Sequence, residues 1–147
     1  MLVNETQLRV QYYETDQMGV VHHSNYIRYF ETGRTEFMRQ LGLFYKNLED
    51  SGTVMPIINV EVRYFFPANY DDIIYIRSSI KELPKARITF NYEVYNEERK
   101  LLASGSTTSA FIDKETGRPQ RAPETMIQAL SEYLSGNLHR PNSGTTI

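Results

Sequence analysis

The 147-residue sequence contains no cysteine and no tryptophan. Without cysteine, the chain has no disulfide bonds, no thiolate metal sites and no cysteine nucleophile. It does not open on a basic segment followed by an apolar stretch, and no apolar run approaches the roughly 18 residues that a membrane span needs. We therefore expect a cytoplasmic protein that does not insert stably into membranes.

The sequence also lacks an excess of positive charge. Its 16 Lys and Arg residues are set against 18 Asp and Glu residues, which gives a formal net charge of -2. Such a chain has no general attraction to nucleic acid. The phosphate-binding patterns GxxxxGKS/T and GxGxxG are absent, and so is the Gly-x-Ser-x-Gly motif of α/β-hydrolases. Nothing here favours nucleotide-dependent chemistry or that kind of serine nucleophile.

Tyrosine, in contrast, is frequent, with eleven residues. Tyrosine suits surfaces that are apolar on one side and wet on the other, such as clefts and subunit contacts. The chain length favours a single domain, which we assign to residues 1–136, and a chain of this size buries about 68–70% of its unfolded surface. Residues 137–147 show no periodicity, and we expect them to form a mobile tail.

Apolar periodicity predicts one long helix among short strands. The helix starts at Tyr26, with Ser24 or Asn25 as its N-cap, and ends at Gly42 as a C′ glycine. Alternating apolar residues predict strands over 8–13, 60–66, 74–80, 88–94 and 101–112, with a polar connection over 44–53 and a short helix after Pro123. This order favours an α+β protein in which one sheet of about five antiparallel strands wraps around the long helix.

Small residues suggest where helix and sheet approach most closely. Gly33 lies inside the predicted helix, where it costs about 1 kcal/mol relative to Ala. The last long strand is rich in small side chains, from Ala103 to Ser106. We expect Gly33 to pack against that strand. The outer face of the sheet carries Tyr, Ile and Thr, so we also expect part of it to meet another subunit.

The most informative stretch for chemistry joins the first strand to the long helix. Asp16 precedes a backbone break at Gly19 and the start of the helix. A helix start has N–H groups without internal partners and a partial positive charge, so it suits an anion or a developing oxyanion. A carboxylate held there is a candidate nucleophile or general base for acyl transfer. A purely local role for Asp16, as a turn-former or cap, fits the same pattern.

Residues 13–26, YETDQMGVVHHSNY, and the helix segment FETGRTE over 30–36 resemble the signature of the 4-hydroxybenzoyl-CoA thioesterase family. The family pattern is roughly aromatic-x-x-T-D-x-x-G-V-V-x-H-x-x-Y, leading into a helix that contains F-E-x-x-R. The resemblance is closest to the bacterial acyl-CoA thioesterase branch that includes the enzyme linked to the Tol–Pal cluster. It covers about residues 6–134 and is looser in the downstream strands.

The resemblance implies the hotdog fold and hydrolysis of acyl-CoA thioesters without a cofactor. It also implies a homodimer or homotetramer, with sheets paired edge to edge and active sites at the dimer interface. Asp16 then becomes the catalytic carboxylate, acting as nucleophile or general base. The backbone N–H of His23 becomes the oxyanion donor, and the His23 side chain orients the thioester or Asp16. Gly19 lets the turn pass close to the substrate.

The same resemblance suggests residues that contact the substrate. Val20 and His22 flank the turn, and His22 stands where this branch often has Tyr, which leaves its role open. Tyr26, with Tyr29 and Phe30, is a candidate wall of an acyl tunnel. For the phosphates of coenzyme A the first choice is Lys85 and Arg87, at a turn between strands, and the second is Arg118 and Arg121; ordinary solvated surface charges are the alternative for all four.

Several other readings stay open. Glu31 and Glu36 are rival catalytic carboxylates, because another hotdog branch has its carboxylate on the long helix, although salt bridges with helix arginines also explain them. The thioester carrier is either coenzyme A or acyl carrier protein, and a non-catalytic acyl-CoA-binding protein would share the fold. We expect no metal, because adjacent residues such as His22 and His23 seldom face one ion and no further His or Cys cluster is present.

Overall fold

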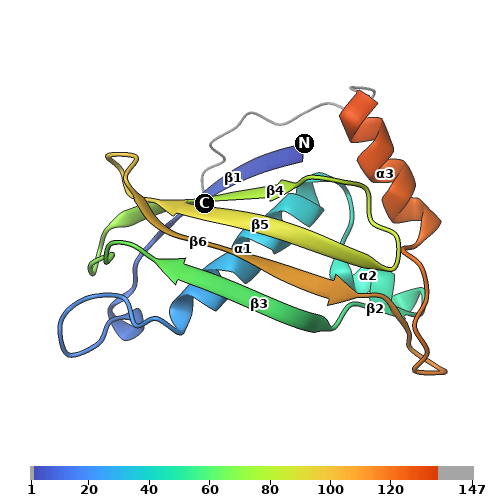
Figure 1. Cartoon of the computed structure of the whole chain (residues 1–147), viewed down its shortest axis with the longest axis horizontal. Coiled ribbons are helices and arrows are strands. Elements are labelled where there is room, and N and C mark those ends of the chain that lie inside the picture. The colour runs from blue at the N-terminus through green and yellow to red at the C-terminus, as the bar shows by residue number, and fades with distance from the viewer. Residues whose placement is uncertain (1, 136–147) are drawn as a thin grey trace.

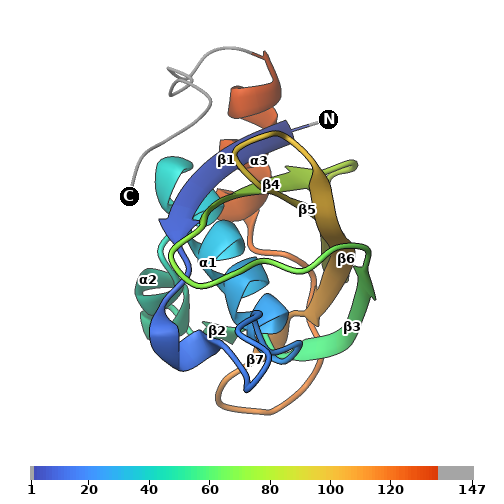
Figure 2. The same ribbon diagram turned by 90° about the vertical axis from the view of Figure 1, so that its left-hand side faces the viewer.

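The computed structural model describes residues 2–135. Five strands form one antiparallel sheet in the order β1-β4-β5-β6-β3 (Figure 1). Their bounds are β1 Leu2–Arg9, β3 Ile57–Tyr64, β4 Ile73–Ile80, β5 Arg87–Tyr95 and β6 Leu101–Ala110. The sheet curls around helix α1, Asn25–Gln40 (Figure 2). The hotdog fold expected from the sequence is therefore confirmed.

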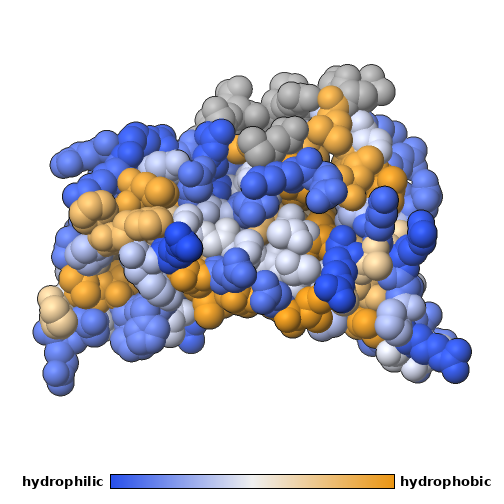
Figure 3. Space-filling view, in the orientation of Figure 1, coloured by the Kyte–Doolittle hydropathy of each residue, from blue (hydrophilic) through white to orange (hydrophobic). Residues whose placement is uncertain are grey.

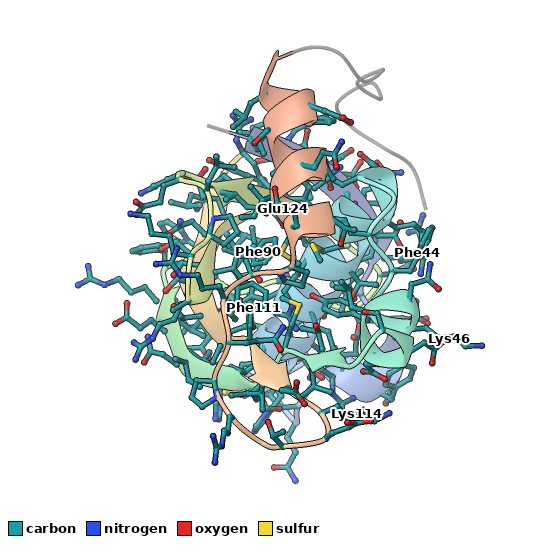
Figure 4. The ribbon with its side chains drawn as sticks, turned by 90° about the vertical axis from the view of Figure 1, so that its right-hand side faces the viewer. Phe44, Lys46, Phe90, Phe111, Lys114 and Glu124 are labelled. Carbon is teal, nitrogen blue, oxygen red and sulfur yellow. The ribbon has the colours of Figure 1, made fainter. Side chains whose placement is uncertain are left out.

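Smaller elements complete the domain. A 3-10 turn η1, Tyr12–Glu14, follows β1, and helix α2, Tyr45–Asp50, follows α1. Strands β2, Thr53–Val54, and β7, Ile112–Asp113, pair as a short antiparallel ribbon, and helix α3, Glu124–Ser135, comes last. In the view of Figure 4, Phe90 and Phe111 point into the interior, whereas the exposed Lys46 and Lys114 point outwards.

The core lies between α1 and the inner face of the sheet. Alternate residues of β4 and β5 are buried, as predicted, and include Ile74, Ile76, Ile88, Phe90 and Val94. On α1 the buried residues include Tyr26, Tyr29, Phe30, Phe37 and Met38. Because the buried positions follow a period of two in the strands and 3.6 in the helix, one apolar layer joins the two elements.

Helix α1 ends as its sequence predicts. Gly42 has a φ of +75°, its N–H donates to the Arg39 carbonyl at 3.0 Å, and the Leu43 N–H donates to the Met38 carbonyl at 2.8 Å. These two hydrogen bonds are those of a Schellman motif, which satisfies carbonyls that lack a partner within the helix.

A buried arginine ties α1 to the sheet and to α2. Arg34 is 8% exposed, and its guanidinium donates to Tyr45 Oη at 3.0 Å, Tyr92 Oη at 3.2 Å and Thr107 Oγ1 at 3.3 Å. None of these three partners is a carboxylate. A buried cation needs such bonds because desolvation without them is costly.

The close contact expected for Gly33 was assigned to the wrong strand. A Cβ at Gly33 would lie 2.5 Å from Ser78 Oγ and 2.7 Å from Ile76 Cγ2, so this glycine packs against β4 rather than β6. The small residues of β6 accommodate Phe30 instead, since a Cβ at Gly105 would lie 2.6 Å from that ring and 2.2 Å from the Glu61 carbonyl oxygen. Both glycines thus allow close packing of α1, one against β4 and the other in β6, with β5 between these two strands.

Two local predictions were wrong. The first strand runs over Leu2–Arg9 instead of residues 8–13, and residues 45–50, expected as a polar connection, form α2. The start of β1 is rich in polar residues, but Asn4, Glu5 and Thr6 are buried and have internal partners. Paired polar groups are tolerated inside a protein, and hydropathy alone does not reveal them.

The edge strand β3 exposes apolar side chains. Val60, Val62 and Tyr64 pair with Thr107, Gly105 and Ala103, so they share the inner face of the sheet. Val60 nevertheless remains 36% exposed and Tyr64 50% exposed. Figure 3 shows apolar surface over the region of β3. An edge strand with exposed apolar residues and unpaired backbone is a template for association.

Within residues 2–135, no helix is long and apolar enough to cross a membrane. The tail predicted over 137–147 and the glycine at 136 lie outside the described residues.

We expect Gly105→Ala to lower the free energy of unfolding by about 1–3 kcal/mol, because the new methyl group overpacks the site against the backbone of β3 and the ring of Phe30. Urea denaturation measures the change. Gly33→Ala is the matched control, and we expect it to lose less stability. Its new methyl group meets side-chain atoms rather than backbone, and the higher helix propensity of Ala offsets about 1 kcal/mol of the loss. Equal losses in the two variants would contradict this account.

Candidate active site

The loop between η1 and α1 is a tight turn pinned at both sides. Thr15 bridges to Val21, and Val20 bridges to Asn69 in the segment that follows β3. Within the turn the Asp16 N–H donates to the Val20 carbonyl at 2.9 Å, and the Gly19 N–H donates to the Asp16 carbonyl at 3.0 Å. Gly19 has a φ of +78°, a conformation that favours glycine. The glycine is therefore required by the turn itself.

The Asp16 side chain is half-buried and takes part in two local features. Its Oδ1 accepts a hydrogen bond from the Met18 N–H at 2.8 Å, so the turn-forming role considered from sequence is present. It also lines an open cavity of about 300 Å³, together with Val21, His23, Tyr26 and Tyr64. Asp16 thus stabilises its own turn and faces a site that a ligand can reach.

The start of α1 has its N-cap residue where the sequence predicts it, but without the expected side-chain hydrogen bond. Ser24 occupies the N-cap position, but its side chain makes no capping hydrogen bond. Instead, His22 Nδ1 accepts from the Ser24 N–H at 3.3 Å and lies 2.8 Å from Ser24 Oγ. The His22 ring therefore satisfies one N–H that the helix itself leaves unpaired.

The next backbone donors show which group remains available. The His22 N–H donates to the Glu14 carbonyl at 2.8 Å, and the Asn25 N–H donates to the His22 carbonyl at 3.0 Å. The His23 N–H has no hydrogen-bond partner among residues 2–135. An unpaired N–H beside a cavity, directly before the N-cap of a helix, suits the stabilisation of negative charge.

Aromatic rings surround the cavity. The ring of Tyr64 lies edge-on to Tyr26 at 5.2 Å and to His23 at 6.4 Å, and its hydroxyl donates to the His23 carbonyl at 3.0 Å. Phe65 and Phe66 also line the cavity, and Lys100 Nζ lies 3.5 Å from the centroid of Phe66. Sequence reasoning did not assign Tyr64, Phe65 or Phe66 to the site. The aromatic run YFF was the available signal.

The three expected walls of the acyl tunnel separate in the structure. Tyr26 borders the Asp16 cavity, but Phe30 is a core residue stacked on Tyr92 at 4.4 Å. Tyr29 borders a second cavity of about 640 Å³ that is also lined by Glu14 and Arg28. Among the three, Tyr26 alone meets the Asp16 cavity.

Lys85 and Arg87 lie at the opposite end of the sheet. Arg87 pairs with Ala110, whereas Tyr64 of the Asp16 cavity pairs with Ala103, seven residues away along β6. At a rise of about 3.3 Å per residue, that separation is about 23 Å. Lys85 instead lines a cavity of about 330 Å³ with Arg121, between the β4–β5 turn and α3. One chain does not bring these cations to Asp16.

The rival carboxylates do not line the Asp16 cavity. Glu36 forms a salt bridge with Arg39 at 2.9 Å, as the helix pattern predicts, and Glu31 is exposed on the surface of α1. In the described part of the chain, no group of three His, Asp or Glu residues is placed to hold a metal ion.

Comparison with known proteins gives consistent matches. Residues 10–130 match the model of the thioesterase-like superfamily. The acyl-CoA thioesterase YbgC of Helicobacter pylori is 37% identical over 132 residues, covering 84% of this chain and 96% of the relative. The structure also resembles a hypothetical protein from Thermus thermophilus, with 37% identity, a TM-score of 0.81 and coverage of 87% and 97%. It also resembles a DHNA-CoA thioesterase from Staphylococcus aureus, with 28% identity and a TM-score of 0.85. That match covers 93% of this chain and 94% of the other.

The tyrosines around α1 generate a prediction about alkaline pH. Burial raises the pKa of Tyr26, Tyr45 and Tyr92 above the usual 10.0, and burial followed by the Glu14 carboxylate raises the pKa of Tyr29. Above pH 10 the unfolded chain loses tyrosine protons that the folded chain keeps. We therefore expect stability from these groups to be complete below pH 10 and to fall as pH rises further.

Urea denaturation across this range measures the effect. Tyr29→Phe removes one of the responsible groups, so the decline should be shallower in that variant. A stability that stays constant well above pH 10 would show that the phenols ionise as easily in the folded chain as in the unfolded one.

Proposed function

The chain belongs to the thioesterase-like superfamily and is an acyl-CoA thioesterase, and we propose that Asp16 is the carboxylate that performs the hydrolysis. One observation carries the proposal: Asp16 borders the same open cavity as His23, whose N–H has no partner within residues 2–135. Thioester hydrolysis requires a nucleophile or base, together with a donor for the oxyanion. Both groups are present here in the loop that leads into α1.

In the proposed reaction the thioester carbonyl oxygen accepts a hydrogen bond from the His23 N–H. An Asp16 oxygen then attacks the carbonyl carbon, or removes a proton from a water molecule that attacks it. The carbon–sulfur bond breaks, and the thiolate of coenzyme A takes up a proton and leaves as coenzyme A. On the nucleophilic route this leaves a mixed anhydride between Asp16 and the acyl group, which a water molecule hydrolyses to the free acid and the Asp16 carboxylate. On the general-base route the attacking water gives the free acid directly. Loss of one oxyanion donor typically raises the barrier by about 2.7–4 kcal/mol, so the N–H matters as much as the carboxylate.

We assign the remaining contacts by position. Gly19 and Val20 form the turn under the thioester, Tyr26 lines the acyl side, and the His23 ring orients the thioester or Asp16. His22 acts through the helix start, which its ring caps. Lys85 and Arg87 lie far from their own Asp16, so they reach the phosphates of a bound coenzyme A only from another subunit.

That requirement fits a homodimer, or a homotetramer built from it, joined through β3. Val60 and Tyr64 lie on the inner face of the sheet and remain exposed, which leaves an apolar surface beside the Asp16 cavity. Pairing of two β3 edges would extend the sheet and cover this surface. We further propose that the enzyme works in the cytoplasm and without a cofactor, since coenzyme A is part of the substrate and the proposed steps use only a carboxylate and an amide.

We expect Asp16→Asn to lower kcat by about 10²–10⁴-fold, because the amide can neither attack nor accept a proton. Thiol release from short, long and aromatic acyl-CoA esters measures the rate, and the same acyl groups on acyl carrier protein identify the preferred carrier. Glu31→Gln, a charge-matched change on α1, should retain wild-type turnover. Near wild-type turnover in Asp16→Asn, with loss in Glu31→Gln, would assign the chemistry to the helix.

We expect Val60→Asp to convert the assembly into monomers, because it puts a charge on the apolar edge. Light scattering coupled to gel filtration gives the mass. Gln128→Lys on the exposed surface of α3 is the control and should leave the mass unchanged. A Val60→Asp protein that keeps the wild-type oligomeric mass would rule out β3 as the interface.

A further inference from the structure

Asn25 is a buried polar residue at the point where α1 begins. It is 7% exposed, and its side chain does not cap its own helix. Its Nδ2 donates instead to the backbone carbonyl of Glu14, at 2.9 Å, eleven residues earlier in the chain. This hydrogen bond spans the whole turn that carries Asp16.

The Glu14 carbonyl is a junction between two segments. It accepts the Asn25 amide and also the His22 N–H, at 2.8 Å. Glu14 itself is 8% exposed, and its carboxylate accepts the Gln11 N–H at 2.7 Å. The backbone two residues before Asp16 is therefore fixed to His22 and to Asn25, the first residue of α1.

This junction determines which backbone donor stays free. With the His22 N–H committed to Glu14, the His23 N–H that follows has no partner among the residues that the structure describes. The same carbonyl thus fixes the start of the Asp16 turn and orients the peptides on either side of His22. A shift at Glu14 would move the carboxylate and the free N–H relative to each other.

We propose that Asn25 is a positioning residue of the thioesterase. Its side-chain amide holds the Asp16 turn in register with the His23 N–H, and it touches neither substrate nor reacting atoms. The inference rests on the function proposed above. Hydrolysis depends on this register, because displacement of a reacting group by about 1 Å can cost on the order of 10²-fold in rate.

A matched control separates positioning from ordinary stability. Asn4 is 6% exposed, and its Nδ2 donates to the Gln40 side chain at the opposite end of α1. Asn25→Ala and Asn4→Ala therefore each remove one buried amide that binds across to another segment. Both should lower the melting temperature to a similar extent.

The expected difference lies in catalysis. Asn25→Ala should lower kcat by about 10–100-fold with a change in KM of less than about threefold, whereas Asn4→Ala should leave both within about twofold. Equal kcat values in the two variants would overturn the proposal. Asn25→Asp keeps the shape of the side chain but replaces the donor by an acceptor. It should lower kcat at least as much as Asn25→Ala, and it replaces the alanine variant in this test if that variant does not fold.

A double-mutant cycle tests whether Asn25 acts through Asp16. In the Asp16→Asn background, the further loss caused by Asn25→Ala should shrink to less than about threefold, because the group that it positions is gone. A loss of the same size in both backgrounds would make Asn25 independent of Asp16 and overturn the inference. Near wild-type activity of the Asp16→Asn single variant would refute the proposed role of Asp16. That measurement does not involve Asn25, so it tests the proposed function separately from the positioning role.

Discussion

The stacking of Phe30 on Tyr92, over the bare backbone of Gly105, fixes how closely α1 lies against the sheet. Gly33 allows an equally close approach of α1 to β4, on the other side of β5. Packed interiors resist displacement because each contact is already near its optimal distance. Side-chain packing along the middle of α1 therefore fixes the direction of the helix axis. As a result, the first turn of α1 has a fixed position at one end of the sheet.

Polar contacts fix the local backbone geometry of the site, which apolar packing does not determine. Among residues 15–21, the turn that carries Asp16, Val21 is the one buried apolar side chain, and backbone bonds to Val20, Ala68 and Glu14 fix the course of the turn. Buried hydrogen bonds specify geometry more sharply than apolar contacts, because their strength depends on direction. The apolar core thus determines where the site lies, and the hydrogen bonds around Glu14 determine the relative placement of its groups.

Much of this architecture could be predicted from the sequence. The period of two in β4 and β5 and the apolar stripe of α1 depend on local pattern, and all three elements lie within a few residues of the predicted bounds. Helix α2 has six residues, of which Leu48 alone is buried, so it has no period to detect. The polar start of β1 was missed because Asn4 and Glu5 find partners, Gln40 and Arg99, that only the fold brings near.

The candidate site divides in the same way. Asp16 and His23 were found because the turn and helix start form one continuous stretch whose spacing is itself informative. Tyr64 and Phe66 were not assigned, since their place at the cavity depends on how the segment after β3 pairs with the turn through Val20 and Asn69. That pairing is a long-range register, which a local pattern does not encode.

The hydrogen bonds of Arg34 have a consequence for the stability of the fold at acidic pH. Ion pairs inside proteins commonly fail when their carboxylates become protonated, but this guanidinium is held by the hydroxyls of Tyr45, Tyr92 and Thr107. Hydroxyl partners stay neutral, and a guanidinium keeps its proton, across the whole mildly acidic range. The link between α1, the sheet and α2 therefore has no acid-labile member, and losses of structure at low pH would begin elsewhere in the molecule.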